Sequence, residues 1–242
     1  MMKEVRNDIL YSDGCDTMEL AKKYGTPFYV ISAKGIKDRF EELRNCFTEK
    51  YSGARVAYAA KAFFPFAMAR LVAQEGMCVD VVSGGELYTA IKAGFPAERI
   101  EFNGNNKLRE ELDMAIEYGV GRIIVDGFTE LDRKEEICRE KVKKANVLFR
   151  LTPGIDCHSH DYMVTAKLDS KFGFSMDEDN LIPKIQQAIE SEWIELKGFH
   201  FHVGSQIFDN SYHLLALVLN GKLIQRACGA KKYLGTRNLS YC

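Results

Sequence analysis

Short β-rich segments alternate with amphipathic helical segments along most of the chain, and this alternation limits the possible folds more than any other feature. Four segments repeat apolar residues at helical spacing, namely residues 86–93, 107–118, 129–144 and 179–191. Six shorter segments between and around them predict strands, namely residues 55–61, 78–83, 100–103, 122–126, 146–151 and 198–203. Strands that alternate with helices predict a parallel sheet with right-handed crossovers.

The regular spacing of these units favours an α/β fold of the (β/α)8 type, a TIM-type barrel, over an open doubly wound sheet. A typical barrel of this kind takes about 250 residues. Residues 1–34 lie outside the repeat and are expected to form an N-terminal extension. Residues 35–242 are therefore expected to form an incomplete barrel of about six to seven strands, the seventh starting at residues 238–242. Gly94, Gly119 and Gly121 are predicted to end helices.

Charge and composition exclude several classes of protein. The chain has 33 basic and 34 acidic residues, so its formal net charge is −1 and no basic stripe is available for nucleic acid. The N-terminus has no apolar signal-peptide core, and charged residues interrupt the longest apolar stretches, so no membrane span is expected. Seven scattered cysteines without a C-x-x-C pair are typical of reduced thiols, which predicts a cytoplasmic protein.

The C-terminal segment differs in charge from the rest of the chain. Residues 210–242 contain no Asp or Glu, although they contain several Lys and Arg residues. One interpretation is a basic surface helix. The other is that the tail from about residue 221 is foreign to the fold.

Two residues, one at the end of the first predicted strand and one within the second, are candidates for chemistry. Lys61 follows an apolar run, where burial is expected to lower the pKa of its amine and make it more nucleophilic. A lysine that reaches solvent at the strand end is the alternative. Asp80 lies within CVDVV and needs a partner in or near the barrel mouth. Ser83 and Glu86 have the spacing of a capping box, which gives them a structural role.

Histidines and a long loop supply further candidates. His200 and His202 are two residues apart and share a face of the predicted strand, which suits either a metal or an aromatic ring stacked on a flat cofactor. A second pair, His158 and His160, lies in the loop of residues 152–175. A backbone-satisfied core histidine is the structural alternative. Loops of this length are often functional.

Two more polar residues follow predicted strands. Arg150 ends the fifth strand, and the Gly-Ser pair that includes Ser205 follows the sixth. A serine hydroxyl beside a glycine is suited to contact an anion.

Six segments together resemble the fold-type III pyridoxal-phosphate decarboxylases, the alanine-racemase-like barrel family. The segments are TPFYV, VAYAAKA, VDVVSGGEL, FNGNNK, LTPGIDCHSHDYMVTAKLDSKFGF and GFHFHVGSQIFD, and they span roughly residues 15–215. The last two are most similar to the diaminopimelate decarboxylases. The resemblance implies pyridoxal 5′-phosphate as cofactor, decarboxylation of a small amino acid as the reaction, and no bound metal.

The resemblance also implies a role for each matching residue. Lys61 is expected to bind the cofactor's aldehyde, His202 to stack on its ring and Ser205 to contact its phosphate. Asp80 and Arg150 match polar residues of the same site. Glu86 and Lys171 are weaker matches.

The resemblance implies further parts that do not occur in this sequence. These are the glycine-rich phosphate loop, the glutamate and arginine of the eighth strand, and the C-terminal β-domain. In the family that domain packs with the N-terminal extension and completes the partner's site in a homodimer. We therefore expect a partial form, inactive by itself.

The alternatives left open are of three kinds. Decarboxylation of meso-diaminopimelate to L-lysine is the first expectation, and ornithine, arginine or carboxynorspermidine are alternative substrates. A non-catalytic fragment is the second kind. A metal hydrolase built on the histidine pairs is the third.

Overall fold

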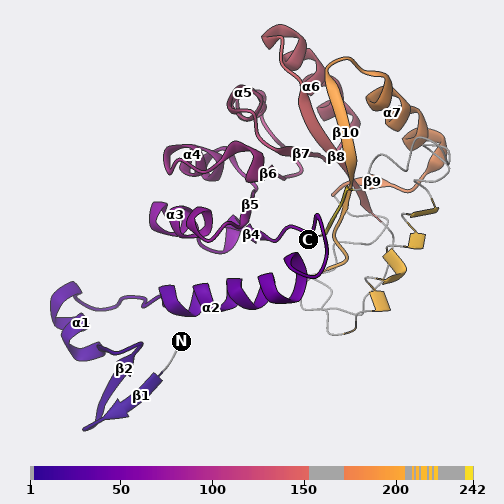
Figure 1. Ribbon diagram of the computed structural model, residues 1–242. Helices are drawn as coiled ribbons and strands as arrows, with labels where there is room; N and C mark the ends of the chain where they lie inside the picture. The colour runs from indigo at the N-terminus through magenta and orange to yellow at the C-terminus, as the bar shows by residue number, and fades with distance from the viewer. Residues whose placement is uncertain are drawn as a thin grey trace.

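A curved sheet of parallel strands forms the centre of the molecule (Figure 1). The computed structural model describes residues 3–152, 172–204, 209, 211–212, 214–216, 218–219, 221–222 and 238–241. The strands are β4 (Ala57–Ala59), β5 (Cys78–Val81), β6 (Ile100–Phe102), β7 (Arg122–Val125), β8 (Ala145–Thr152), β10 (Ile194–Phe201) and β11 (Asn238–Tyr241). Their order in the sheet, β11-β10-β8-β7-β6-β5-β4, follows the sequence, and each pairs parallel with its neighbour. Sequential parallel order is the pattern of a (β/α) barrel wall, so the predicted fold class is confirmed.

Helices cover the outer face of this sheet (Figure 1). They are α3 (Phe66–Gln74), α4 (Gly84–Lys92), α5 (Arg109–Tyr118), α6 (Phe128–Lys141) and α7 (Glu178–Glu190). The four predicted helices correspond to α4 through α7, whereas α3 had not been predicted. Single-turn 3₁₀ helices precede β6 (η3, Ala97–Arg99) and follow β4 (η2, Ala60–Ala62), and the short strand β9 (Phe174–Ser175) pairs parallel with the end of β8.

The core lies between the sheet and these helices. Alternate strand residues such as Val79, Phe102 and Phe149 belong to one buried cluster with helix residues such as Leu112 and Leu131. Side chains alternate across a strand, so one face of each strand meets the helices. Burial of each such side chain contributes roughly 1.5–3 kcal/mol. The outward residues therefore hold the helices on the sheet.

The other residues of the same strands form a polar inner face. Asp80, Glu101, Arg122, Arg150 and His200 alternate with the outward apolar residues of β5, β6, β7, β8 and β10. Nη1 of Arg122 donates to Oε1 of Glu101 at 2.9 Å, between neighbouring strands. Arg122 and Glu101 are thus paired with each other, which offsets the cost of removing these two charges from water.

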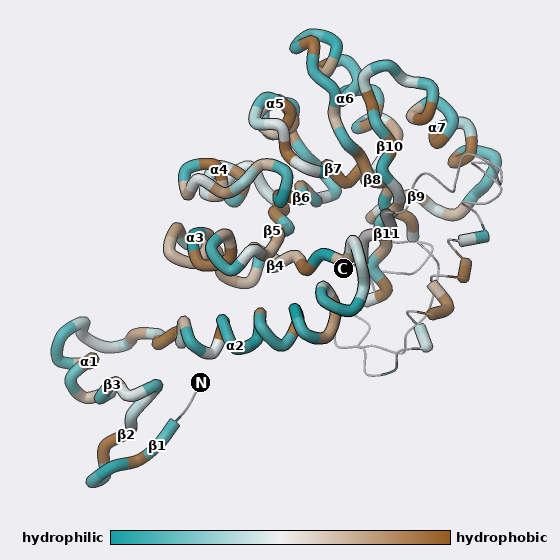
Figure 2. Tube along the Cα trace, viewed as in Figure 1, coloured by the Kyte–Doolittle hydropathy of each residue, from teal (hydrophilic) through white to brown (hydrophobic). Residues whose placement is uncertain are grey.

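The N-terminal segment stands apart from the sheet (Figure 1). Strands β1 (Lys3–Arg6), β2 (Ile9–Ser12) and β3 (Cys15–Asp16) form a small antiparallel sheet, followed by α1 (Thr17–Tyr24). Then α2 (Ala33–Leu43), which is mostly hydrophilic (Figure 2), continues into a short π-helical turn η1 (Arg44–Thr48). The side chain of Phe40 on α2 is buried, and its ring lies edge-on to Tyr58 at 6.4 Å. This contact attaches α2 to β4.

Three further predictions concern the seventh strand, Gly119 and Gly121. The seventh strand is confirmed, since β11 pairs with β10 from Gly198↔Asn238 onward. Gly119 caps α5 in the left-handed conformation, as predicted. The prediction for Gly121 is wrong, because α5 has already ended. A Cβ at Gly121 would lie 2.4 Å from the carbonyl oxygen of Glu98, so glycine is needed there for close packing of two backbone segments.

We expect Gly121→Ala to destabilise the fold by about 1–3 kcal/mol, because the added methyl group overlaps the Glu98 backbone. Urea unfolding followed by circular dichroism measures the change. Gly85→Ala is the matched control: its Cβ would meet nothing closer than 3.9 Å, and alanine favours the helix. An equal loss in both variants would contradict this explanation of Gly121.

Candidate functional site

The predicted site residues that the structure describes gather at the carboxyl edge of the parallel sheet. Asp80 on β5 and Arg150 on β8 are buried. The strand register places His200 of β10 opposite Arg150, and Asp80 opposite Ala59, two residues before Lys61. Ser205 lies outside the described residues, as do Lys171, His158 and His160. In barrels of this type the carboxyl edge holds the active site.

Lys61 is exposed, so the predicted burial of its amine is wrong. Strand β4 ends at Ala59, earlier than predicted, and the chain turns into the 3₁₀ helix η2. In that turn Ala60 is buried, whereas Lys61 is exposed. Its amine is therefore accessible to a bound aldehyde.

The capping residues after β5 are structural. Oγ of Ser83 accepts from the backbone N–H of Glu86 at 3.3 Å, as predicted for a helix N-cap. Glu86 reaches back one residue further than expected, and its Oε2 accepts from the N–H of Val82 at 2.7 Å. The two side chains thus hold the turn that follows Asp80.

His200 and His202 differ in environment. His200 is 1% exposed within β10, and its Nε2 lies 3.4 Å from Nδ2 of Asn103 across the inner face. Burial, with Arg150 and His202 as further causes, lowers the pKa of His200 to about 3, so the ring is neutral near pH 7. His202 follows the strand end and is half-buried. The two rings therefore lie at different depths, and His202 is nearer the mouth.

Arg150 has a carboxylate partner that the sequence analysis did not single out. Its Nη1 lies 3.5 Å from Oδ1 of Asp126, and its guanidinium stacks 4.4 Å from the ring centre of Phe172. Oδ2 of Asp126 accepts from the N–H of Gly173 at 3.0 Å. Burial raises the pKa of Asp126, although Gly173 and Arg150 oppose that shift. The sequence feature that could have identified Asp126 is a carboxylate directly after the predicted strand segment RIIV.

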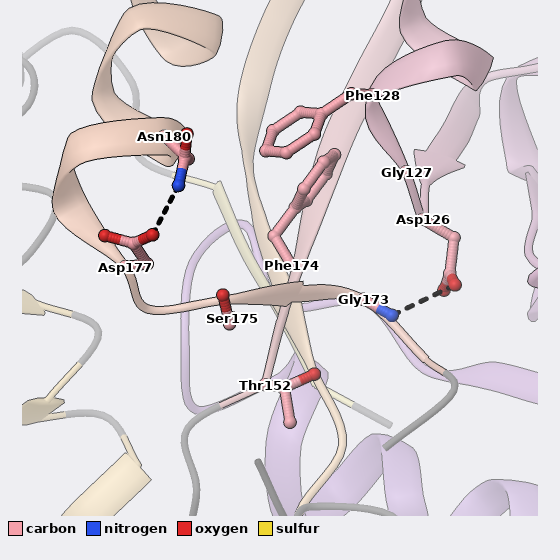
Figure 3. A pocket seen from close by; sticks show the side chains of 9 residues that line it. All are labelled: Asp126, Gly127, Phe128, Thr152, Gly173, Phe174, Ser175, Asp177 and Asn180. Carbon is pink, nitrogen blue, oxygen red and sulfur yellow. Dashed lines mark hydrogen bonds between the residues drawn. The ribbon is translucent and has the colours of Figure 1, made fainter. Parts of the chain in front are cut away.

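A cavity of about 320 Å³ adjoins this pair at the ends of β7 and β8 (Figure 3). The rings of Phe128 and Phe174 lie 4.8 Å apart on one side, and Asp177 accepts from Asn180 on another. The full lining consists of Asp126, Gly127, Phe128, Thr152, Gly173, Phe174, Ser175, Asp177 and Asn180. The cavity therefore opens beside the site, with Asp126 shared between them.

Two buried lysines share one carboxylate behind the same edge. Nζ of Lys107 lies 2.9 Å, and Nζ of Lys134 2.5 Å, from Oε1 of Glu130. Burial lowers the pKa of Lys134 to about 8, even though Glu130 opposes the shift. Burial alone would raise the pKa of Glu130, but the two lysines lower it. The sequence analysis missed all three residues, because charged residues in a helical segment usually face solvent.

Within the described ranges, no three His, Cys, Asp or Glu side chains gather closely enough to hold a metal ion. None of the helices described there is long and apolar enough to cross a membrane. Of the cysteines that the structure describes, Cys15, Cys46, Cys78 and Cys138 are free thiols.

Residues 33–230 match the family model of the pyridoxal-dependent decarboxylases, pyridoxal binding domain. The match covers most of the chain. This chain belongs to that family.

Curated relatives agree with this assignment. The chain is 51% identical over 203 residues to the diaminopimelate decarboxylase of Bacillus methanolicus, covering 84% of this chain and 47% of that protein. It is 50% identical to the diaminopimelate decarboxylase of Bacillus subtilis, with 84% and 46% covered. The chain therefore spans about half the length of the curated relatives it matches.

Solved structures show the same fold. Diaminopimelate decarboxylase from M. jannaschii, in co-complex with L-lysine, matches with a TM-score of 0.87 at 33% identity, covering 99% of this chain and 56% of that one. A diaminopimelate decarboxylase from Helicobacter pylori, complexed with L-lysine, matches with a TM-score of 0.82 at 29% identity over 93% of this chain and 55% of that one. The sheet described above is therefore the barrel part of this fold.

We expect acid to destabilise the fold through His200. Its pKa is lower in the fold (about 3) than its ordinary 6.5, so the unfolded chain binds a proton first as pH falls. Well above pH 6.5 His200 is neutral in both states and does not change the free energy of unfolding. Below pH 6.5 that free energy falls, by about 2 kcal/mol at pH 5. Urea unfolding at pH 7 and pH 5 measures the loss. His200→Gln has no such proton, so its loss should be smaller; an equal loss would contradict the assignment.

Proposed function

We propose that this chain supplies the pyridoxal-phosphate-binding part of an amino-acid decarboxylase. The observation that carries the proposal is the position of Lys61. Its exposed amine follows the first barrel strand, on the edge where buried Asp80 and Arg150 also lie. An accessible amine on the same sheet edge as buried polar groups can form a covalent bond with an aldehyde cofactor.

The chemistry of the donor set suits the cofactor. Pyridoxal phosphate has an aldehyde, a flat ring and an anionic phosphate, and the described residues include an exposed amine, a half-buried imidazole at His202 and a buried guanidinium at Arg150. Asp80 adds a buried carboxylate. These residues therefore fit an aldehyde-bearing aromatic anion.

Each residue has a distinct task in the proposal. Lys61 holds the aldehyde, and the ring of His202 lies against the face of the cofactor ring. Ser205 contacts the phosphate. Asp80 and Arg150 orient polar groups at the inner face, where the 3.5 Å pair with Asp126 restrains Arg150.

The bound cofactor supplies a ring that accepts the electron pair left when carbon dioxide departs. The protein's part is to bind, orient and exclude water. Asp80, Arg150 and His200 are buried, so little solvent reaches them. Charge interactions are stronger where water is excluded.

The substrate proposed is meso-diaminopimelate, decarboxylated at its D-centre to give L-lysine. The support is the name carried by relatives that are 46–51% identical. Ornithine, arginine and carboxynorspermidine are the alternative substrates.

The remaining expectations concern the whole protein. We propose a cytoplasmic homodimer in which residues 1–34 pack against a C-terminal β-domain. The N-terminal segment exposes apolar side chains that suit such packing, among them Val5 at 69% and Tyr29 at 98%. Burial of these residues removes apolar surface from water.

Pyridoxal phosphate added to the purified chain should become attached at Lys61. Borohydride reduction followed by peptide mapping should find the reduced cofactor on Lys61, and Lys61→Ala should abolish specific labelling. Lys92→Ala, which removes an exposed amine on α4, is the matched control and should label as the parent does. Labelling spread evenly over surface lysines would refute the proposed site.

Substrate choice is tested on the chain co-expressed with the remaining C-terminal half of the Bacillus methanolicus relative. Carbon dioxide release is measured side by side for meso-diaminopimelate, ornithine and arginine. We expect at least a tenfold preference in kcat/KM for the first, about the discrimination that one well-placed polar contact supplies. Preferential use of ornithine would overturn the substrate proposal and leave the cofactor proposal intact.

A further inference from the structure

The side chain of Lys107 connects the ends of two neighbouring strands. Its Nζ donates to the carbonyl oxygen of Gly104 at 2.6 Å, after β6, and to that of Ile124 at 2.7 Å, in β7. The third ammonium proton is directed to Oε1 of Glu130 at 2.9 Å. An ammonium group has three donors, so every one is used. With its side chain 1% exposed, Lys107 acts as a rigid brace at the carboxyl edge.

A first series of contacts, called an arm below, connects Lys107 to His200. The N–H of Gly104, whose carbonyl Lys107 holds, donates to Oδ1 of Asn103 at 3.0 Å. That bond fixes the orientation of the amide and leaves its Nδ2 directed at Nε2 of His200, 3.4 Å away. Nδ2 is a donor, so a hydrogen bond between the two atoms requires Nε2 to accept, which places the proton of the neutral ring on Nδ1. Lys107 is thus connected to His200 through Gly104 and Asn103.

A second arm leads to Arg150. Glu130, which accepts from Lys107, also accepts from the N–H of Asp126 through Oε2 at 3.2 Å. The carboxylate of Asp126 in turn lies 3.5 Å from Arg150. Because His200 and Arg150 are opposite each other in the β10–β8 register, the two arms end at adjacent points of the inner face.

A buried charge cluster is poor evidence of stabilisation, since apolar side chains of equal volume often serve as well. Hydrogen bonds, unlike apolar contacts, fix the orientation of the groups that they join. Lys134 provides an internal comparison, because its side chain is equally buried and pairs with the same Glu130 oxygen. The hydrogen bonds to strand-end carbonyls described above come from Lys107 and not from Lys134.

We infer that Lys107 is a positioning residue for the pyridoxal site, which orients His200 and Arg150 without touching the ligand. The inference rests on the proposed function for the identity of the ligand. The hydrogen bonds from Lys107 toward His200 and Glu130 are present in the chain without any ligand.

The test compares Lys107→Met with Lys134→Met in the full 242-residue chain. Long-range ¹H–¹⁵N spectra of the histidine rings, assigned with His200→Gln, report the tautomer without any cofactor. We expect His200 to lose its single Nδ1–H tautomer in Lys107→Met and to keep it in Lys134→Met. The dissociation constant of pyridoxal phosphate, from absorbance titration, should rise about tenfold in Lys107→Met alone, the effect of losing one orienting hydrogen bond.

Equal effects in the two lysine variants, or an unchanged His200 tautomer in Lys107→Met, would overturn the inference. If Lys107→Met does not fold, Asn103→Leu cuts the same arm while it keeps every buried charge, and the same change at His200 is expected. Failure of the parent chain to bind pyridoxal phosphate would refute the proposed function instead. The ring spectra still decide the role of Lys107 in that case.

Discussion

Side-chain alternation along parallel strands is the constraint on which the rest of this structure depends. Successive residues point to opposite faces, so Val79 and Phe149 meet the helices while Asp80 and Arg150 face inward. The parallel register then brings the ends of β5, β8 and β10 to one edge. A one-residue slip would exchange the two faces, which would bury charges against apolar helices. The core and the site are therefore two consequences of the same register.

Several charges on and behind the inner face are tolerated because they have a nearby partner of opposite sign. Arg122 pairs with Glu101, Arg150 with Asp126, and two lysines share Glu130. Removing one partner of a buried pair leaves an uncompensated charge, at a cost of about 3–5 kcal/mol. The pairs therefore restrict how this edge can rearrange, and they hold the side chains that would meet a ligand.

The match of residues 33–230 to the pyridoxal binding domain places this sheet edge in the pyridoxal-dependent decarboxylase family. The chain matches diaminopimelate decarboxylase from M. jannaschii with a TM-score of 0.87 and covers 56% of that solved chain. Activity and substrate choice remain proposals, because the chain spans about half the length of the curated relatives it matches.

The sequence by itself determined the fold class, the parallel order and most element positions, because apolar periodicity is a local property that survives in a single chain. It also placed Asp80, Arg150 and His200 on predicted strands, and the structure brings those strands together in one parallel sheet. Only the tertiary structure decided the rest. Lys61 is exposed because β4 ends early in a 3₁₀ turn, and Gly121 is required by the Glu98 backbone. Glu130 and Lys134 are neighbours on α6, but Lys107 reaches Glu130 from the segment after β6, 23 residues earlier, and no local pattern records that contact.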